Sequence, residues 1–270
     1  MASRSRSRLL FALALPPVAV GYGIHRGLTT LETKYPSLSP ESTTSQALSI
    51  PRHLGQQHCP HIHVHAARVP VSALRPYADP ARKDTSKLTS QDLQFAWARA
   101  LIGSPLLRNE ARIAGLFTNG RISLGDMGHT AGGFSLKTED GSPRQLLNGV
   151  IVVQRPPGEE GLLGAWIVPD GPRELFEKIS RWGYSSRLMS GGRHETSVSE
   201  PFEGEGEDKA NGPFVEVRLA SAHDYEIFPE EGNLQKMIPA WLDRLHRGYA
   251  RWILHKAVCE VQQNASERGS

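Results

Sequence analysis

Histidines cluster in one short segment and alternate there with aliphatic residues. Five of the eleven histidines lie between positions 53 and 65, and His61, His63 and His65 are separated by single aliphatic residues. This period of two predicts a β-strand with the three imidazoles on one face. Imidazoles on alternate strand positions can bind zinc, but no acidic ligand motif follows them. A polar or pocket-lining strand face is therefore the main interpretation, and a metal site is the alternative.

Two further clusters place an imidazole beside a carboxylate. They are the segments 193–195, with the sequence Arg-His-Glu, and 223–225, with the sequence His-Asp-Tyr. Such pairs can orient a base and raise its pKa. Adjacent strand residues point to opposite faces, however, so His194 and Glu195 cannot both enter one pocket without a bulge. Surface ion pairs and strand-end caps are one interpretation, and a catalytic or ligand-orienting role is the other.

Aromatic residues recur at helical spacing near the C-terminus, where Trp241, Tyr249 and Trp252 lie. Such rings are usually core residues. If a sheet wraps this helix, the same rings would also line a cavity for an apolar ligand. With Trp166, on a predicted strand, they form the predicted substrate-binding set.

Several standard signatures are missing from the sequence. It contains no Gly-x-Ser-x-Gly elbow, P-loop or dinucleotide fingerprint, and we predict no cofactor. No stripe of Lys and Arg with interleaved aromatics is present, so we predict no nucleic-acid partner. The two cysteines, Cys59 and Cys259, could make at most one disulfide.

The spacing of apolar residues and of Gly and Pro predicts the elements that must position these side chains. Strands are predicted over 61–66, 146–155, 162–168, 193–200 and 214–221, and helices over 89–101, 104–115, 172–182 and 238–262. The order predicts an α+β fold with a curved antiparallel sheet, two helices after the first strand and a long C-terminal helix. This order resembles the helix-grip arrangement of START-like and Bet v 1-like proteins. Another α+β roll or a partly closed barrel is the alternative.

Composition and the positions of Gly and Pro divide the chain into four segments. The 270 residues are 39% hydrophobic and 22% charged, with a net charge of +3 and a mean hydropathy of −0.38, which are ordinary values for a globular protein. We predict a single α+β domain over 58–262. A basic, hydrophobic leader over 1–30, a surface linker over 31–57 and a tail over 263–270 would flank it.

The leader itself predicts contact with a membrane. Arg4, Arg6 and Arg8 precede an uncharged run from Leu9 to Ile24. We interpret this run as a signal anchor, a transmembrane helix in the endoplasmic reticulum membrane that would place the domain in the lumen. A cleaved secretory signal and a mitochondrial presequence are the alternatives.

Three segments resemble one family of proteins: VVQRPPGEEG at 152–161, ELFEKISRWGYSSRLMSGGRHE at 174–195 and VRLASAHDYEIF at 217–228. The family consists of filamentous-fungal proteins that share a hydrophobic leader and often accompany natural-product gene clusters. The resemblance implies a cofactor-free cyclase or isomerase, Diels–Alderase-like, acting on a hydrophobic terpenoid or polyketide intermediate.

Such catalysis needs an apolar cavity that holds the reacting groups in position and a hydrogen-bond donor for a substrate carbonyl. The candidate donors are Arg193, His194, His223 and Tyr225. Two other functions remain open. A lipid or sterol carrier would use the same cavity without chemistry, and a metal-dependent hydrolase or lyase would use the histidine strand.

Overall fold

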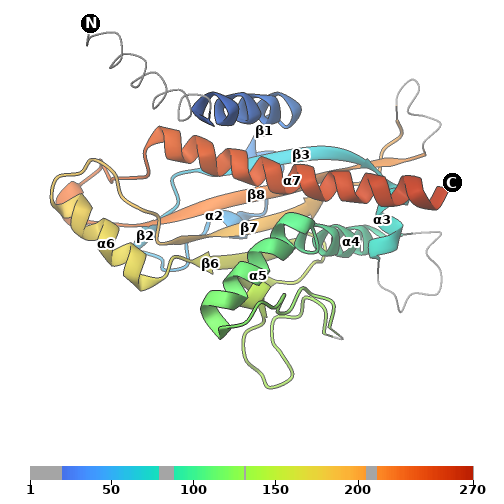
Figure 1. The fold of residues 1–270 in the computed structure, drawn as a ribbon, viewed down its shortest axis with the longest axis horizontal. Coiled ribbons are helices and arrows are strands. Elements are labelled where there is room, and N and C mark those ends of the chain that lie inside the picture. The colour runs from blue at the N-terminus through green and yellow to red at the C-terminus, as the bar shows by residue number, and fades with distance from the viewer. Residues whose placement is uncertain (1–19, 79–87, 131, 205–211, 270) are drawn as a thin grey trace, which may run out of the picture.

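The computed structural model describes residues 20–78, 88–130, 132–204 and 212–269. Within these residues the fold is α+β, as predicted, with one eight-stranded antiparallel sheet in the order β1-β3-β8-β7-β6-β5-β4 and with β2 paired to β8 (Figure 1). The long C-terminal helix crosses the sheet. Its 30 residues give it a length of about 45 Å.

The elements have the following bounds. The strands are β1 Ser37–Leu38, β2 Gln57–His58, β3 Ile62–Pro70, β4 Gln145–Leu146, β5 Ile151–Arg155, β6 Leu162–Ile167, β7 Gly191–Val198 and β8 Phe214–Glu226. The α-helices are α2 Gln46–Ser49, α3 Val71–Leu74, α4 Ser90–Ile102, α5 Pro105–Asn119, α6 Asp170–Arg181 and α7 Ala240–Gly269. Short 3₁₀ turns cover Pro40–Ser42, Arg75–Tyr77, Leu147–Gly149 and Pro229–Glu231.

Local sequence explains the ends of α4 and α5. Thr89 and Asp92 form a capping box at the start of α4, which satisfies two backbone N–H groups. Helix α5 begins at Pro105, as predicted, but it continues past Gly115 and ends where Gly120 adopts φ +64°. Gly115 has a packing role instead. A Cβ there would lie 2.9 Å from the carbonyl oxygen of Arg121.

The sheet has two faces that differ in what covers them. Helices α4, α5 and α7 pack over one face and enclose the main apolar core, which includes Trp97, Leu219 and Leu254. The opposite face carries α2 and a small apolar cluster around Leu48. We call these the α7 face and the α2 face. Because strand side chains alternate, neighbouring residues of β7 and β8 belong to different faces.

The segment predicted as a surface linker, 31–57, is built into the fold. It contributes β1, which pairs with β3, and the buried side chains of Tyr35 and Leu48. The Tyr35 hydroxyl also makes a 2.8 Å hydrogen bond with His255 of α7. Two-residue strands and a four-residue helix are too short to leave a periodic signal, so the sequence indicated only turns.

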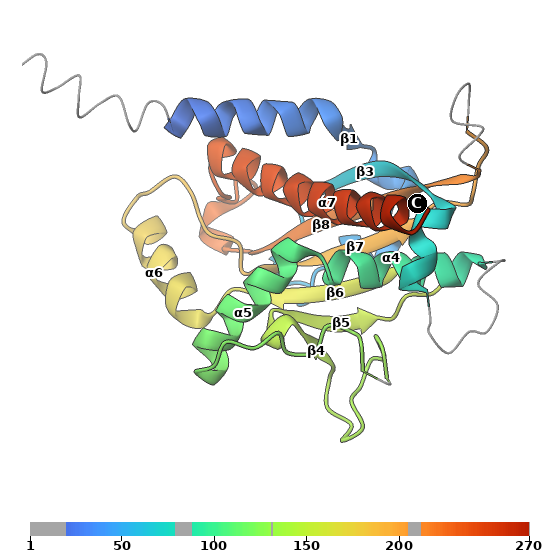
Figure 2. The same ribbon diagram turned by 45° about the vertical axis from the view of Figure 1, so that its right-hand side comes forward.

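The prediction of a transmembrane helix is contradicted. Among the described residues, no helix has both the length and the apolar composition that crossing a bilayer requires. Of the run from Leu9 to Ile24, residues 9–19 lie outside the described part of the chain. Residues 20–34 form a helix that lies along α7, where Arg244 pairs with Glu32 at 2.9 Å (Figure 2). The polar side chains of this segment explain why it packs on the protein as a surface helix.

Candidate functional site

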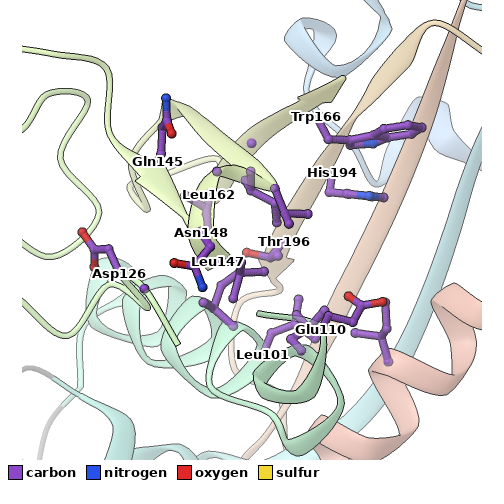
Figure 3. Close-up of a pocket in the computed structure, with 18 of the residues that line it drawn as sticks. Leu101, Glu110, Asp126, Gln145, Leu147, Asn148, Leu162, Trp166, His194 and Thr196 are labelled. Atoms are coloured by element: carbon purple, nitrogen blue, oxygen red, sulfur yellow. The ribbon is translucent and has the colours of Figure 1, made fainter. Parts of the chain in front are cut away.

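The α7 face holds a cavity of about 900 Å³ between the sheet and helices α4, α5 and α7 (Figure 3). Most of its wall is apolar: Leu101, Leu107, Leu147, Ile151, Leu162, Leu219, Ala250 and Ile253. Its size lies in the range of pockets that bind small organic molecules. The cavity that the sequence predicted between the sheet and the C-terminal helix is therefore present.

Three of the predicted site residues line this cavity: Trp166, His194 and Tyr249. The rings of Trp166 and His194 stack, with centroids 6.0 Å apart and planes inclined by 18°. Gly192 is the cross-strand partner of Trp166 in β7, and a Cβ there would lie 2.9 Å from the indole. The absence of a side chain at Gly192 leaves room for the indole.

Glu110 is a cavity residue that the sequence analysis missed. It lies on α5, and its carboxylate accepts a hydrogen bond from the hydroxyl of Tyr249 on α7. Burial raises the pKa of Glu110 above its ordinary value. Glu110 follows Leu107 by three positions and so falls on the inward stripe of α5. A carboxylate on an apolar stripe was the signal that could have identified it.

Histidines form a group at the end of the cavity near Trp166. His246 of α7 lines the cavity, and its ring lies 4.4 Å from that of His223, centroid to centroid. Burial, with a smaller effect of His246, lowers the pKa of His194 to about 4. Burial likewise lowers the pKa of His223 to about 2, again with His246 contributing. The imidazoles of His194 and His223 are therefore neutral at physiological pH.

Two polar atoms of the cavity lining are buried without a hydrogen-bond partner among the described residues. They are the hydroxyl oxygen of Thr196 and the indole nitrogen of Trp166. A buried polar group without a partner costs about 1–3 kcal/mol. A ligand carrying an acceptor oxygen would satisfy either group, since both can donate.

Arg193, a predicted donor, points away from the cavity. It lies on the α2 face, where its guanidinium binds the Asp224 carboxylate with two bonds of 2.9 and 2.8 Å and donates to the Leu48 carbonyl. Burial raises the pKa of Asp224, and the positive charge of Arg193 opposes that rise. Glu195 lies on the same face and pairs with Arg155 at 2.8 Å. Strand alternation separates these charges from His194, as the sequence indicated.

The remaining predicted residues lie outside the cavity wall. The ring of His223 contacts those of Trp166 and His246 edge-on. Tyr225 is buried beside His58, and burial raises the pKa of Tyr225 to about 12. Trp241 and Trp252 are 63% and 42% exposed. These two tryptophans project from α7 on sides that the sheet does not cover. The helical period identified aromatic residues on α7 without showing which of them face the sheet.

The three strand histidines do not converge on one point. His61 is exposed, and His65 is fully buried with burial lowering its pKa to about 3. His63 instead approaches Asp243 of α7, with 3.3 Å between the imidazole nitrogen and the carboxylate oxygen. Among the described residues, the potential metal ligands that come together are His63, His223 and Asp243, with ligand atoms within 4.8 Å of one another.

The two cysteines do not form the one disulfide that the sequence allowed. Both Cys59 and Cys259 are free thiols. Cys59 is half-buried beside β8, and burial raises the pKa of its thiol. Cys259 lies on the exposed side of α7.

No family model matches the chain, and comparison with curated proteins and with solved structures finds no match either. The site is therefore defined by the geometry of this chain alone. Its components are an apolar cavity, a half-buried carboxyl group hydrogen-bonded to a phenol, neutral imidazoles, and two donors without partners among the described residues.

Proposed function

We propose that the protein is a cofactor-independent cyclase or isomerase that acts on a hydrophobic terpenoid or polyketide intermediate. The observation that carries this proposal is the apolar cavity of about 900 Å³ with Glu110 and Tyr249 in its wall. The proposal is compatible with the helix-grip arrangement that the element order suggests. The resemblance to fungal cluster proteins, and within them to the norbornene-forming Diels–Alderase of the sordarin pathway, supports the same class of reaction.

Positioning is the first contribution that such a cavity makes. A flexible polyene confined between α7 and the sheet loses the freedom to sample unreactive conformers before the reaction begins. Holding two reacting groups in contact can lower a barrier by several kcal/mol, up to about 7–11 kcal/mol in the best cases. The turn between β4 and β5 makes this part of the cavity wall rigid. Leu147, Asn148 and Gly149 all have positive φ there, and the Asn148 amide donates to the Ala111 carbonyl of α5 at 2.8 Å.

Hydrogen bonding to the substrate is the second contribution. The protonated form of Glu110 can donate to a carbonyl oxygen, and the Tyr249 hydroxyl, which donates to the Glu110 carboxyl group, orients it. A donor that is oriented beforehand stabilises negative charge developing on the carbonyl oxygen. The raised pKa of Glu110 increases the fraction of its carboxyl group that carries the proton. Thr196 and Trp166 supply further donors at the opposite wall.

These donors favour catalysis over simple transport. A carrier needs shape and apolar surface, and buried donors without partners lower its stability without improving its affinity for a hydrocarbon. A substrate with an oxygenated reacting centre would satisfy them. We therefore place transport second and use it as the competing outcome in the test.

Gene deletion followed by complementation tests the proposal. Deletion in the native host should cause a less cyclised precursor to accumulate and the cyclised product to disappear. The purified full-length protein, added to an extract that contains the precursor, should restore the product. Glu110→Gln and Tyr249→Phe variants should lower the rate by about 10²–10⁴-fold, the usual range for removal of a positioned acid or base.

Glu260→Gln is the matched control. Glu260 is a part-buried α7 carboxylate whose pKa burial also raises, but it pairs with Arg108 and is not among the residues that line the cavity. This variant should keep the wild-type rate. Deletion that changes only the amounts of metabolites, with all structures still formed, would contradict the enzyme and favour the carrier.

A further inference from the structure

A cluster of potential metal ligands lies next to the cavity but outside its wall. His63 comes from β3, His223 from β8 and Asp243 from the first turn of α7. Strands β3 and β8 are antiparallel neighbours in which His63 is opposite Ser221. His63 and His223 are therefore diagonal neighbours on the α7 face. Three elements that are distant in sequence thus bring two imidazoles and one carboxylate to one point.

His223 has a buried polar atom that none of the described residues satisfies. Its side chain is 1% exposed, and its Nε2 atom has no hydrogen-bond partner among the described residues. A buried nitrogen in this state is unfavourable, and a bound cation would give its lone pair a partner. The Nε2 atom of His63 and the Oδ1 atom of Asp243 lie only 3.3 Å apart. Each of the three residues has one potential ligand atom within 4.8 Å of those of the other two.

Neighbouring side chains contact all three of these residues and restrain them, as outer-shell partners do in metal sites. Arg247, one turn further along α7, pairs with the second carboxylate oxygen of Asp243 at 3.1 Å, so that Oδ1 remains directed toward His63. The ring of His61 stacks on that of His63 with centroids 6.2 Å apart. The ring of His246 meets that of His223 edge-on, and His246 itself lines the cavity.

We propose that His63, His223 and Asp243 bind a divalent transition-metal ion. Two imidazoles with one carboxylate suit zinc or ferrous iron and do not suit calcium or magnesium, which prefer oxygen ligands. Three protein ligands leave a further position for water. The ion ties the first turn of α7 to β3 and β8 and so fixes the helix that roofs the cavity. This inference is independent of the proposed cyclisation, because its readouts are metal content and stability.

Calorimetric titration of the metal-stripped full-length protein with zinc chloride tests the proposal. One equivalent of zinc should bind, and cobalt added in its place should give the visible absorption of a nitrogen- and oxygen-ligated ion. At zinc concentrations about 100-fold above Kd, the melting temperature should rise by on the order of 5 °C. Asp243→Asn, a change at a part-exposed side chain, should weaken zinc binding at least tenfold and abolish the rise.

His53→Ala is the matched control, because it removes an exposed histidine that lies outside the cluster and keeps the three ligands. It should bind zinc as the wild type does. His223→Gln should lose binding while its circular dichroism spectrum remains that of the wild type. The proposal is overturned if the wild-type protein binds neither zinc nor cobalt, or if His53→Ala loses binding and Asp243→Asn retains it.

Discussion

Polar side chains on the two faces of the sheet differ in whether they have partners. On the α2 face, Arg193 and Asp224 neutralise each other, with bidentate bonds that leave little of either group exposed. On the α7 face, His194 is kept neutral by burial, and the hydroxyl group of Thr196 has no hydrogen-bond partner among the described residues. These residues alternate along two adjacent strands. A paired charge therefore indicates structure here, whereas an unpaired polar atom beside a cavity indicates a place for a ligand.

Removing Arg193 should have the largest effect on stability. Arg193→Met leaves the Asp224 carboxylate buried without its main partner, which costs about 3–5 kcal/mol when a buried ion pair is broken. The free energy of unfolding, measured by urea denaturation, should fall by that amount. The double variant Arg193→Met/Asp224→Leu should recover most of the loss. Loss of less than about 1 kcal/mol in the single variant would show that charges on the α2 face are not structural.

Substitutions at two alanines of α7 should distinguish the cavity from the filled core. Ala250 lines the cavity, whereas Ala257 is fully buried in the apolar core. Ala257→Phe should destabilise the protein by about 1–3 kcal/mol because it overpacks a filled region. Ala250→Phe should cost less, since its ring can enter the cavity, and should abolish turnover. Equal losses of unfolding free energy in the two variants would mean that Ala250 has no free space beside it.

Lowering the pH should destabilise the protein through the buried histidines of the α7 face. His65, His194 and His223 have pKa values lowered by burial to about 3, 4 and 2, below the ordinary 6.5 of the unfolded chain. Between these values the unfolded chain binds protons that the folded chain does not. The stability that these neutral imidazoles contribute is therefore fully present above pH 6.5 and is lost as the pH falls toward their folded-state pKa values. Each histidine should add a slope of up to about 1.4 kcal/mol per pH unit below pH 6.

Urea denaturation between pH 7.5 and 4.5 measures this slope. His194→Asn should flatten it, because one buried imidazole is removed. His53→Asn should leave it unchanged, because that ring is exposed in the folded protein as well. A slope that is the same in all three proteins would show that His194 protonates equally in the folded and unfolded states.

Glu110→Gln should have the smallest effect on stability. Burial raises the pKa of Glu110, so the ionised carboxylate disfavours the folded state above its ordinary pKa of 4.5 and the protonated form does not. The variant should be as stable as the wild type at pH 4 and equal or more stable at pH 7.5, by about 1 kcal/mol or less. Thermal unfolding at the two pH values measures the difference. A variant that is clearly less stable at pH 7.5 would mean that Glu110 is mainly a structural partner of Tyr249.

Regular periodicity made most of the fold predictable. The strands around Trp166 and His194, the capped helix α4 and the long helix α7 all follow from local patterns, and these predictions are confirmed. The single strand predicted over 146–155 is instead divided into β4 and β5 by the turn at Leu147–Gly149. Strand alternation also predicted that His194 and Glu195 would separate. It could not say which of them faces the cavity, because that depends on which face the helices cover.

The contacts that assemble the site join residues distant in sequence, which is why Glu110 was missed although Tyr249 was predicted. Glu110 and Tyr249 are 139 positions apart and meet only because α5 packs against α7. Asp243 reaches His63 across 180 positions. Local patterns place each side chain on a face of its own element, as the apolar stripe of α5 does for Glu110, but they do not show which partner it meets. The same reason explains why Trp241 and Trp252 were placed in the cavity: the helical period was correct, but the direction that the helix presents to the sheet was unknown.

Helix α7 carries two separate stripes of contacts. His246, Tyr249, Ala250 and Ile253 line the cavity, whereas Arg244, Gly248, Arg251 and His255 contact residues 25–37. At 100° per residue the stripes lie on opposite sides of the helix. The helix of residues 20–34 therefore packs against α7 on the side opposite the cavity. A chain that started at residue 35 would lack this helix. A protein shortened in this way would have a loosened roof even though every residue of the cavity wall remained.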